Sequence, residues 1–160
     1  MQKMRILEVV GSLRVGGQER IAASIIEHID KDKFQVDYLV FNDVQSDNSE
    51  IVKNNHGKII CIEDALSNRF KIVQKLTKAM VENGPYDIVH SHGMFNNGYV
   101  MLAAKKLNIP YILHESNAFP GISVKLLAKN ASKVMISFED AKKRLKNREN
   151  ICYTGTSSKV

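Results

Sequence analysis

The sequence predicts an α/β protein in which a mostly parallel sheet is covered by helices on both faces. Apolar strand-like runs alternate with amphipathic helical stretches, from MRILEVV near the start to ICY near the end. The strand-like runs are apolar at consecutive positions, which is typical of parallel strands buried on both faces. No repeat, low-complexity stretch or linker divides the 160 residues, a length that suffices for one domain with its own core. We therefore expect residues 1–160 to form one doubly wound, Rossmann-like domain.

Each expected element follows from a local pattern. The expected strands are residues 4–10, 36–41, 58–62, 87–90, 110–114, 133–137 and 151–153. The expected helices are residues 18–29, a short helix after the polar stretch 43–50, a helix capped by Ser67 and stopped by Gly84-Pro85, and residues 95–107, 122–130 and 139–145. In such sheets ligands bind beyond the carboxyl ends of the strands. The expected site therefore lies in the loops 11–17, 91–97 and 115–121 and in the segment from Thr154 onward.

The composition and the lack of a recognisable signal peptide predict a cytoplasmic globular domain. The chain is 44% apolar and 25% charged, as ordinary globular domains are. No apolar run approaches the ~20 residues that cross a bilayer. The opening MQKMRILEVV lacks the long apolar region and cleavage site of a signal peptide. Cys61 and Cys152 lie in strand-like runs without metal-ligand spacing, so we expect small core residues there.

The positive charge is concentrated near the end of the chain. Residues 1–121 contain fourteen basic and fourteen acidic side chains, whereas residues 122–160 contain nine basic and three acidic ones. Such a basic face is either a solvated helix surface or a contact for an anionic partner. Aromatic residues do not alternate with these basic residues, so we expect no nucleic-acid partner.

The stretch VVGSLRVGGQERIA joins the first strand to the first helix through two adjacent glycines. It lacks the Lys-Ser/Thr pair of a Walker-type loop and the three-glycine spacing of a dinucleotide fingerprint. Gly17 comes just before a helix start, where free N–H groups and the helix dipole favour an anion. Gly16 and Gly17 also allow a ligand to approach the backbone closely. A tight turn and a phosphate site are both consistent with this stretch.

Histidines follow two of the expected strands. His90 continues an apolar run and is expected to be a hydrogen-bonded core residue, with His92 in the loop beyond it. His114 ends the next strand and is followed by Glu115 and, two residues later, Asn117. Imidazoles at one sheet edge suit acid–base or hydrogen-bonding work near neutral pH. A zinc site on these histidines is a weaker alternative, because no cysteine or carboxylate lies at a recognised zinc spacing, and the expectation is no metal.

Three segments carry a resemblance to a known family. They are RILEVVGSLRVGGQERIAASIIEHI, YDIVHSHGMFNNGYVMLAAKKLNIPYILHESN and AKNASKVMISFEDAKKRL. Together they resemble the N-terminal half of a GT-B glycosyltransferase, in particular of the retaining family 4. HESNAFPG and YTG also resemble the inverting, membrane-associated N-acetylglucosaminyltransferase that makes the peptidoglycan lipid precursor. That enzyme has a His after its glycines, where this chain has Gln18 and Glu19.

The resemblance implies roles for particular positions. Gly16 and Gly17 match the glycines that approach the donor diphosphate, and His114 matches a catalytic or substrate-positioning histidine beside the reacting sugar. The residues that match the acceptor-holding loops are Arg14, His92, Glu115 and Asn117.

The resemblance also implies partners. The donor is a nucleotide-diphosphate sugar, the acceptor is a sugar or a lipid-linked sugar, and no cofactor or metal is needed because a second domain supplies cations. That C-terminal donor-binding domain is absent from this chain, so we expect a truncated domain or half of a split enzyme that is inactive alone. The basic residues of the last quarter would suit an anionic membrane surface and a peripheral location on the inner face of the plasma membrane.

The implied function is sugar transfer in envelope, capsular or exopolysaccharide biosynthesis. Two alternatives remain at this stage. One is a non-catalytic, flavodoxin-like ligand-binding or regulatory module, and the other is half of a GT-B nucleotide-sugar epimerase, which needs no acceptor.

Overall fold

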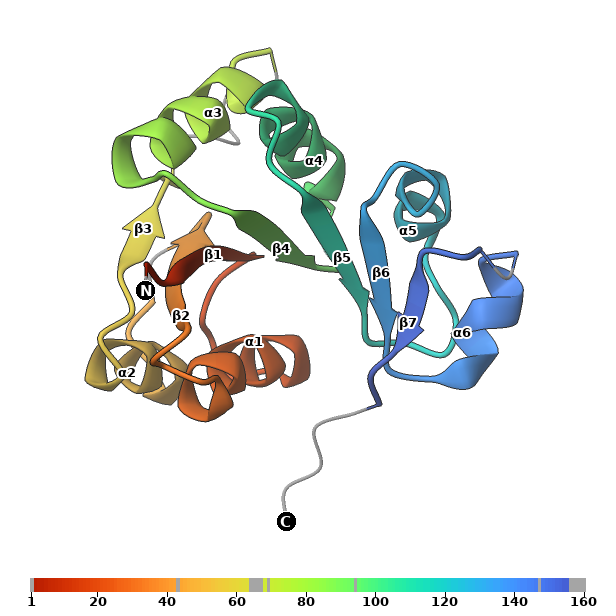
Figure 1. Cartoon of the computed structure of the whole chain (residues 1–160), viewed down its shortest axis with the longest axis horizontal. Coiled ribbons are helices and arrows are strands. Elements are labelled where there is room, and N and C mark those ends of the chain that lie inside the picture. Colours follow the sequence, from red (N-terminus) through yellow and green to blue (C-terminus); the bar gives the residue numbers. More distant parts are fainter. Residues whose placement is uncertain are drawn as a thin grey trace.

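The computed structural model describes residues 2–42, 44–63, 68, 70–93, 95–146 and 148–155, and its strands form one seven-stranded sheet (Figure 1). Every pair of neighbouring strands is parallel. The order across the sheet is β3-β2-β1-β4-β5-β6-β7. The strands are β1 (Met4–Val10), β2 (Phe34–Val40), β3 (Ile59–Cys61), β4 (Ile88–His92), β5 (Tyr111–Glu115), β6 (Lys133–Ile136) and β7 (Ile151–Tyr153). The predicted parallel sheet is confirmed.

Helices cover the sheet on both faces, as predicted. In Figure 1, α1 and α2 lie on one side of the sheet, and α3 and α4 lie on the other. Side chains of α5 and α6 belong to the same apolar cluster as those of α3 and α4. The helices of the described residues are α1 (Gly17–His28), α2 (Asp47–Asn54), α3 (Ile72–Asn83), α4 (Asn97–Lys106), α5 (Ile122–Leu127) and α6 (Glu139–Arg144). Among the described residues, no helix combines the length and apolarity that crossing a bilayer requires.

Alternation along β1 divides the core into two layers. Leu7 and Val9 belong to the apolar cluster that includes Leu76 of α3, whereas Val10 belongs to the cluster under α1 and α2. On the α1 side, the buried Tyr38 hydroxyl donates to the carbonyl of Ala22 over 2.8 Å. Burial of an apolar side chain such as Leu7 or Val9 stabilises the fold by about 1.5–3 kcal/mol relative to an exposed position. The central strands are thus packed on both faces, which fixes the position of their carboxyl ends, where the candidate site lies.

The chain changes direction between β1 and β4. From β1 it winds outward to β2 and β3, and it then returns to place β4 on the other side of β1. Neighbouring connections thus leave β1 and β4 toward opposite faces. The loops that follow these two strands separate there, which makes a crevice at their carboxyl ends.

Several element boundaries differ from the sequence prediction, those of α2 and α5 among them. α2 begins at Asp47, inside the stretch expected to be a polar turn, because the Ser46 hydroxyl accepts a hydrogen bond from the Ser49 amide over 3.3 Å and caps the helix. α5 ends at Leu127, three residues before the predicted end. The predicted cap Ser67 lies outside the described residues. The helix stop at Gly84-Pro85 is confirmed, since α3 ends at Asn83.

The prediction of core cysteines is wrong for Cys152 and holds in part for Cys61, which packs against the cluster under α1 and α2. Cys152 is exposed and Cys61 is half-buried. β7 is an edge strand that pairs only with β6, so one of its sides faces solvent. The apolar run predicted that β7 is buried on both faces, but as an edge strand it is largely exposed.

Candidate functional site

Loops from three strands meet at the β1–β4 switch point. The Gln18 side-chain amide donates to the Ser116 hydroxyl over 3.0 Å and ties the start of α1 to the loop after β5. A Cβ at Gly93 would lie 3.5 Å from that Gln18 amide and 3.5 Å from the His114 carbonyl oxygen, so the loop after β4 lies between them. A cleft of about 490 Å³ is lined here by Gly17, Gln18, Glu19, Ile21, Ser116 and Asn117.

The glycine turn presents an open helix start to this cleft. α1 begins at Gly17, and among the described residues no side chain caps it by a hydrogen bond. The first N–H groups of a helix have no acceptor within the helix, so they are available to an anion. A Cβ at Gly17 would meet no atom within 4 Å. At Gly16 it would lie 2.3 Å from Glu19 Oε2, which places the Glu19 carboxylate over the first turn.

The sheet register brings one carboxylate and three imidazoles together. Glu8 on β1 lies opposite His90 on β4, and His92 lies opposite His114 on β5. Alternate residues of a strand point to the same face, so His90 and His92 share the face of Glu8. All four side chains are buried. They form what we call the histidine cluster: Glu8, His90, His92 and His114.

Glu8 holds two of the imidazoles at once. Its Oε1 lies 2.9 Å from His90 Nδ1, and its Oε2 lies 2.8 Å from His92 Nε2. The His114 ring connects to this pair, since its Nδ1 lies 3.3 Å from His92 Nδ1 and its Nε2 lies 3.2 Å from Ser137 Oγ. The ring centroids of His92 and His114 are 5.2 Å apart.

Burial and hydrogen bonds shift the pKa values of Glu8, His92 and His114. Burial acts to raise the pKa of Glu8, but attraction to His90 and hydrogen bonds from His90 and His92 outweigh it and lower that pKa to about 2. Burial lowers the pKa of His114 to about 3, and the neighbouring imidazoles add to the shift. Burial also lowers the pKa of His92, against the pull of Glu8. At neutral pH, Glu8 is therefore ionised, and His92 and His114 are neutral.

The predicted loop position of His92 is wrong. β4 extends two residues beyond the expected end at His90, and His92 is its last residue. Its ring is buried against Glu8, which makes a polar strand end stable inside the protein. The prediction that His90 is a hydrogen-bonded core residue is confirmed by its contact with Glu8.

Of the other predicted site residues, some are buried and some are exposed. Glu115 is buried, and its Oε1 accepts hydrogen bonds from the Asn117 backbone and side-chain amides, both over 2.8 Å, so it shapes the loop after β5. Asn117 itself is exposed and lines the cleft. Arg14 is exposed, and its carbonyl accepts a hydrogen bond from the Asn48 amide over 2.7 Å. His114 is 7% exposed at the end of β5.

Sequence reasoning missed several members of this site, among them Glu8, Gln18 and Ser137. Glu8 is the acidic residue inside the apolar run MRILEVV, and that isolation is the signal that could have indicated a buried partner. Gln18 and Ser137 gave no local signal. Their roles depend on contacts with Ser116 and His114, which are distant in sequence.

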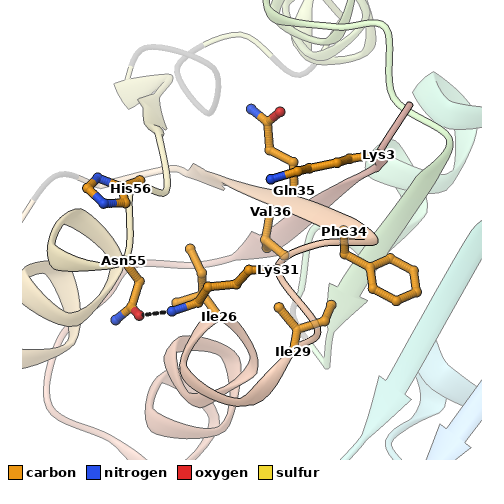
Figure 2. A pocket seen from close by; sticks show the side chains of 9 residues that line it. All are labelled: Lys3, Ile26, Ile29, Lys31, Phe34, Gln35, Val36, Asn55 and His56. Atoms are coloured by element: carbon orange, nitrogen blue, oxygen red, sulfur yellow. Dashed lines mark hydrogen bonds between the residues drawn. The ribbon is translucent and has the colours of Figure 1, made fainter. Parts of the chain in front are cut away.

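A second cavity lies at the amino ends of the strands, away from the candidate site. Figure 2 shows it beyond the ends of α1 and α2, near the amino ends of β1 and β2. Its lining residues are Lys3, Ile26, Ile29, Lys31, Phe34, Gln35, Val36, Asn55 and His56. The Lys31 ammonium donates to the Asn55 side-chain oxygen across it. Because it lies at the amino ends of the strands, it is separate from the candidate site.

An apolar hollow of about 490 Å³ lies between α4 and α5. Its lining residues are Phe95, Asn96, Gly98, Tyr99, Met101, Leu102, Ser123, Leu126 and Leu127. Phe95 is fully exposed, and Leu102 and Leu126 are at least half exposed. Lys125 and Lys129 are exposed beside Leu126 on the same segment. This apolar surface with adjacent positive charge is called the α4–α5 surface.

Comparison with known proteins gives a family match over most of the chain. Residues 15–147 match the sequence model of the family described as Glycosyltransferase Family 4. EpsF of Bacillus subtilis, which is named as a glycosyltransferase, is 29% identical over 115 residues, which are 71% of this chain and 30% of EpsF. The UDP-N-acetylglucosamine–N-acetylmuramyl-(pentapeptide) pyrophosphoryl-undecaprenol N-acetylglucosamine transferase of Ruminiclostridium cellulolyticum is 45% identical over 69 residues, which are 43% of this chain and 19% of that enzyme.

Solved structures show the same fold. MurG of Acinetobacter baumannii matches 99% of this chain with a TM-score of 0.73 and 21% identity, over 46% of its own length. Alr3699/HepE of Anabaena, solved in complex with UDP and glucose, matches 97% of the chain with a TM-score of 0.73 and 15% identity, over 45% of its length. The chain thus spans less than half the length of these relatives and has the fold of the N-terminal domain of GT-B glycosyltransferases.

Proposed function

Because this chain belongs to glycosyltransferase family 4, we propose that it is the acceptor-side domain of an enzyme that transfers a sugar from a nucleotide-diphosphate sugar to another sugar. The observation that carries the proposal is the open helix start at Gly17. No side chain of the described residues caps it, and it borders the cleft at the topological switch point. A departing nucleoside diphosphate develops negative charge, which backbone N–H groups at a helix start stabilise.

Residues around the cleft take the remaining roles in this proposal. Gly16 and Gly17 lie against the donor diphosphate, with the Glu19 carboxylate moving off Gly16 as the phosphates arrive. His114 lies below the reacting sugar and acts on it, or positions it, through the exposed part of its ring. Arg14 and Asn117 contact the acceptor directly. His92 and Glu115 support it from beneath, because their side chains are held by internal hydrogen bonds.

Donor binding requires a second domain in this proposal. The chain spans 30% of EpsF and 46% of MurG, and HepE holds UDP in a protein about twice as long as this match. A donor-binding domain, on the same polypeptide or on a separate subunit, would supply the cations for the phosphates, so transfer needs no metal cofactor. Gln18 and Glu19 follow the glycines, where the inverting enzyme that the sequence also resembles has a His, and this difference supports retention of the anomeric configuration.

The acceptor in this proposal is lipid-linked, and the α4–α5 surface contacts the membrane that holds it. Phe95 and Leu126 would enter the apolar boundary of the bilayer. Lys125 and Lys129 lie beside them, and each lysine near an anionic surface contributes about 1 kcal/mol. The protein would then work at the cytoplasmic face of the plasma membrane, in envelope, capsular or exopolysaccharide biosynthesis.

The test is acceptor-dependent release of nucleoside diphosphate by this chain together with its donor-binding domain. A set of UDP-sugars is incubated with and without polyprenyl-linked sugar acceptors. The proposal predicts release only when an acceptor is present, and loss of release in His114→Ala with the circular dichroism spectrum unchanged. Interconversion of the UDP-sugar without an acceptor would instead identify an epimerase. Equal release by His114→Ala and the parent would contradict the role of His114.

A further inference from the structure

The histidine cluster has the features of a metal site. His90, His92 and His114 each offer one ring nitrogen, and these three atoms lie within 4.8 Å of one another. All three residues are buried, and they come from the adjacent strands β4 and β5. Rigid neighbouring strands therefore hold three potential ligands in place without the help of a loop.

Hydrogen bonds to Glu8 determine which nitrogens carry lone pairs. An ionised carboxylate only accepts hydrogen bonds, so the nitrogens that face it, His90 Nδ1 and His92 Nε2, must carry the protons. This leaves His90 Nε2 and His92 Nδ1 as the ring nitrogens that can offer lone pairs to a ligand. If His114 Nε2 donates to Ser137 Oγ, its Nδ1 has a lone pair as well.

Two geometric details fit a bound metal ion. His90 Nε2 is buried and has no hydrogen-bond partner among the described residues, which is costly unless a ligand binds it. His92 Nδ1 and His114 Nδ1 face each other at 3.3 Å. When two nitrogens bind one tetrahedral Zn²⁺ ion, with Zn–N distances of about 2.0–2.1 Å, the nitrogens are also about 3.3 Å from each other.

We propose that His90 Nε2, His92 Nδ1 and His114 Nδ1 bind one divalent transition-metal ion of the Zn²⁺ class. Glu8 and Ser137 accept the opposite N–H groups of the ligands, as the residues behind metal-binding histidines usually do. The protein supplies three nitrogens, so the fourth position of a tetrahedral ion is left to a solvent molecule. The ion would join β4 to β5 below the cleft. The site shares His114 with the proposed transfer, but binding of the ion does not depend on that transfer.

A proton can replace the metal in the same geometry. His114 Nδ1–H would then donate to His92 Nδ1, and Ser137 would donate to His114 Nε2. That arrangement leaves His90 Nε2 without a partner and predicts no affinity for metal. Measurement of metal binding therefore separates the two arrangements.

The experiment titrates ZnCl₂ into the chain after chelator treatment, with binding followed by calorimetry. Cys61→Ser and Cys152→Ser are introduced first, because both thiols are accessible enough to compete. We expect one ion per chain. Co²⁺ in its place should give the intense visible absorption of a four-coordinate ion. Glu8→Gln should weaken binding about 10–100-fold, the usual effect of removing a partner behind a ligand.

Single-histidine variants test whether the histidine cluster is the Zn²⁺ site. His90→Gln should weaken Zn²⁺ binding at least about 10-fold, and it disturbs the fold least because only one of its ring nitrogens has a partner. His28→Gln and His56→Gln, at positions outside the cluster, are the matched controls and should not change the affinity. Failure of the parent to bind Zn²⁺, or undiminished binding by a folded His90→Gln variant, overturns the proposal. The readout is binding, so loss of sugar transfer has no bearing on it.

Discussion

The Glu8 carboxylate is hydrogen-bonded to His92, with Oε2 2.8 Å from Nε2, although 84 residues separate them in the sequence. This bond joins the central strand β1 to the end of β4 at the point where the chain changes winding direction. Both side chains are buried, so the bond is made away from water and depends on both partners. It keeps a polar strand end inside the protein.

Replacing Glu8 should destabilise the protein. Glu8→Gln places an amide N–H₂ group where two imidazole N–H groups need an acceptor, so we expect the free energy of unfolding to fall by about 1–3 kcal/mol. Urea denaturation at neutral pH measures the change. Glu50→Gln is the control, because Glu50 forms an exposed ion pair with Lys53, and it should change the free energy by less than about 0.5 kcal/mol. Equal stability of the two variants would contradict the account of the cluster.

A side chain at Gly17 should impair donor use and leave the fold intact. The Cβ of Gly17→Ala would meet no protein atom within 4 Å, so it would fill only space that a ligand needs. We expect kcat/KM for the nucleotide sugar to fall about 10-fold or more, the loss that follows removal of a few kcal/mol of phosphate stabilisation. Gly98→Ala in α4 is the control, since its Cβ would meet only Leu127 at 4.0 Å. Unchanged kinetics in Gly17→Ala would argue against a phosphate site at the turn.

Stability should decline as the pH falls below about 6.5. The pKa of His114 is lowered from 6.5 to about 3 in the folded protein, so the unfolded chain takes up a proton that the folded one excludes. Each such histidine removes up to about 1.4 kcal/mol per pH unit in this range. The pKa of Glu8 is lowered from 4.5 to about 2, so its contribution to stability is complete above pH 4.5 and is lost as the pH falls from 4.5 toward 2.

Urea denaturation between about pH 7 and pH 5, in the presence of chelator, tests this pH dependence. His114→Gln should show a shallower decline in the free energy of unfolding than the parent, because the variant has one fewer excluded proton. Parallel pH profiles for the two proteins would show that His114 is not buried in its neutral form.

Membrane binding should depend on the α4–α5 surface. Phe95→Ser and Leu126→Ser alter exposed side chains, so they should keep the fold and reduce cosedimentation with anionic vesicles. Lys125→Gln and Lys129→Gln should each reduce binding about 5-fold, the equivalent of about 1 kcal/mol. Lys53→Gln on α2, which covers the other face, is the matched charge control (Figure 1). Failure of the parent to cosediment with anionic vesicles would exclude the membrane contact, and equal binding to neutral and anionic vesicles would exclude a role for the lysines.

Most of the fold could be predicted because it follows from local patterns. Apolar runs gave the strands, apolar residues at helical spacing gave the helices, and their alternation gave the parallel sheet. The end of β4 was missed because Ser91 and His92 are polar, and only contacts made across the sheet allow them to be buried. Cys152 was misplaced because a local apolar run does not tell an edge strand from a central one.

The candidate site was predicted in outline and not in detail. The rule for strand ends correctly indicated the loops after β1, β4 and β5, which the contacts of Gln18 and Gly93 bring together. The histidine cluster could not be derived from spacing. Glu8 and His90 are 82 residues apart and meet only because the register of β1 and β4 places them opposite each other.

A crystal structure of this chain with its donor-binding domain and an unhydrolysed nucleotide sugar tests the central claim most directly. We predict a diphosphate oxygen about 3 Å from the backbone nitrogen of Gly16 or Gly17, with the Glu19 carboxylate displaced from the first turn of α1. A complex in which the second domain alone holds the phosphates, and Glu19 still covers Gly16, would contradict it.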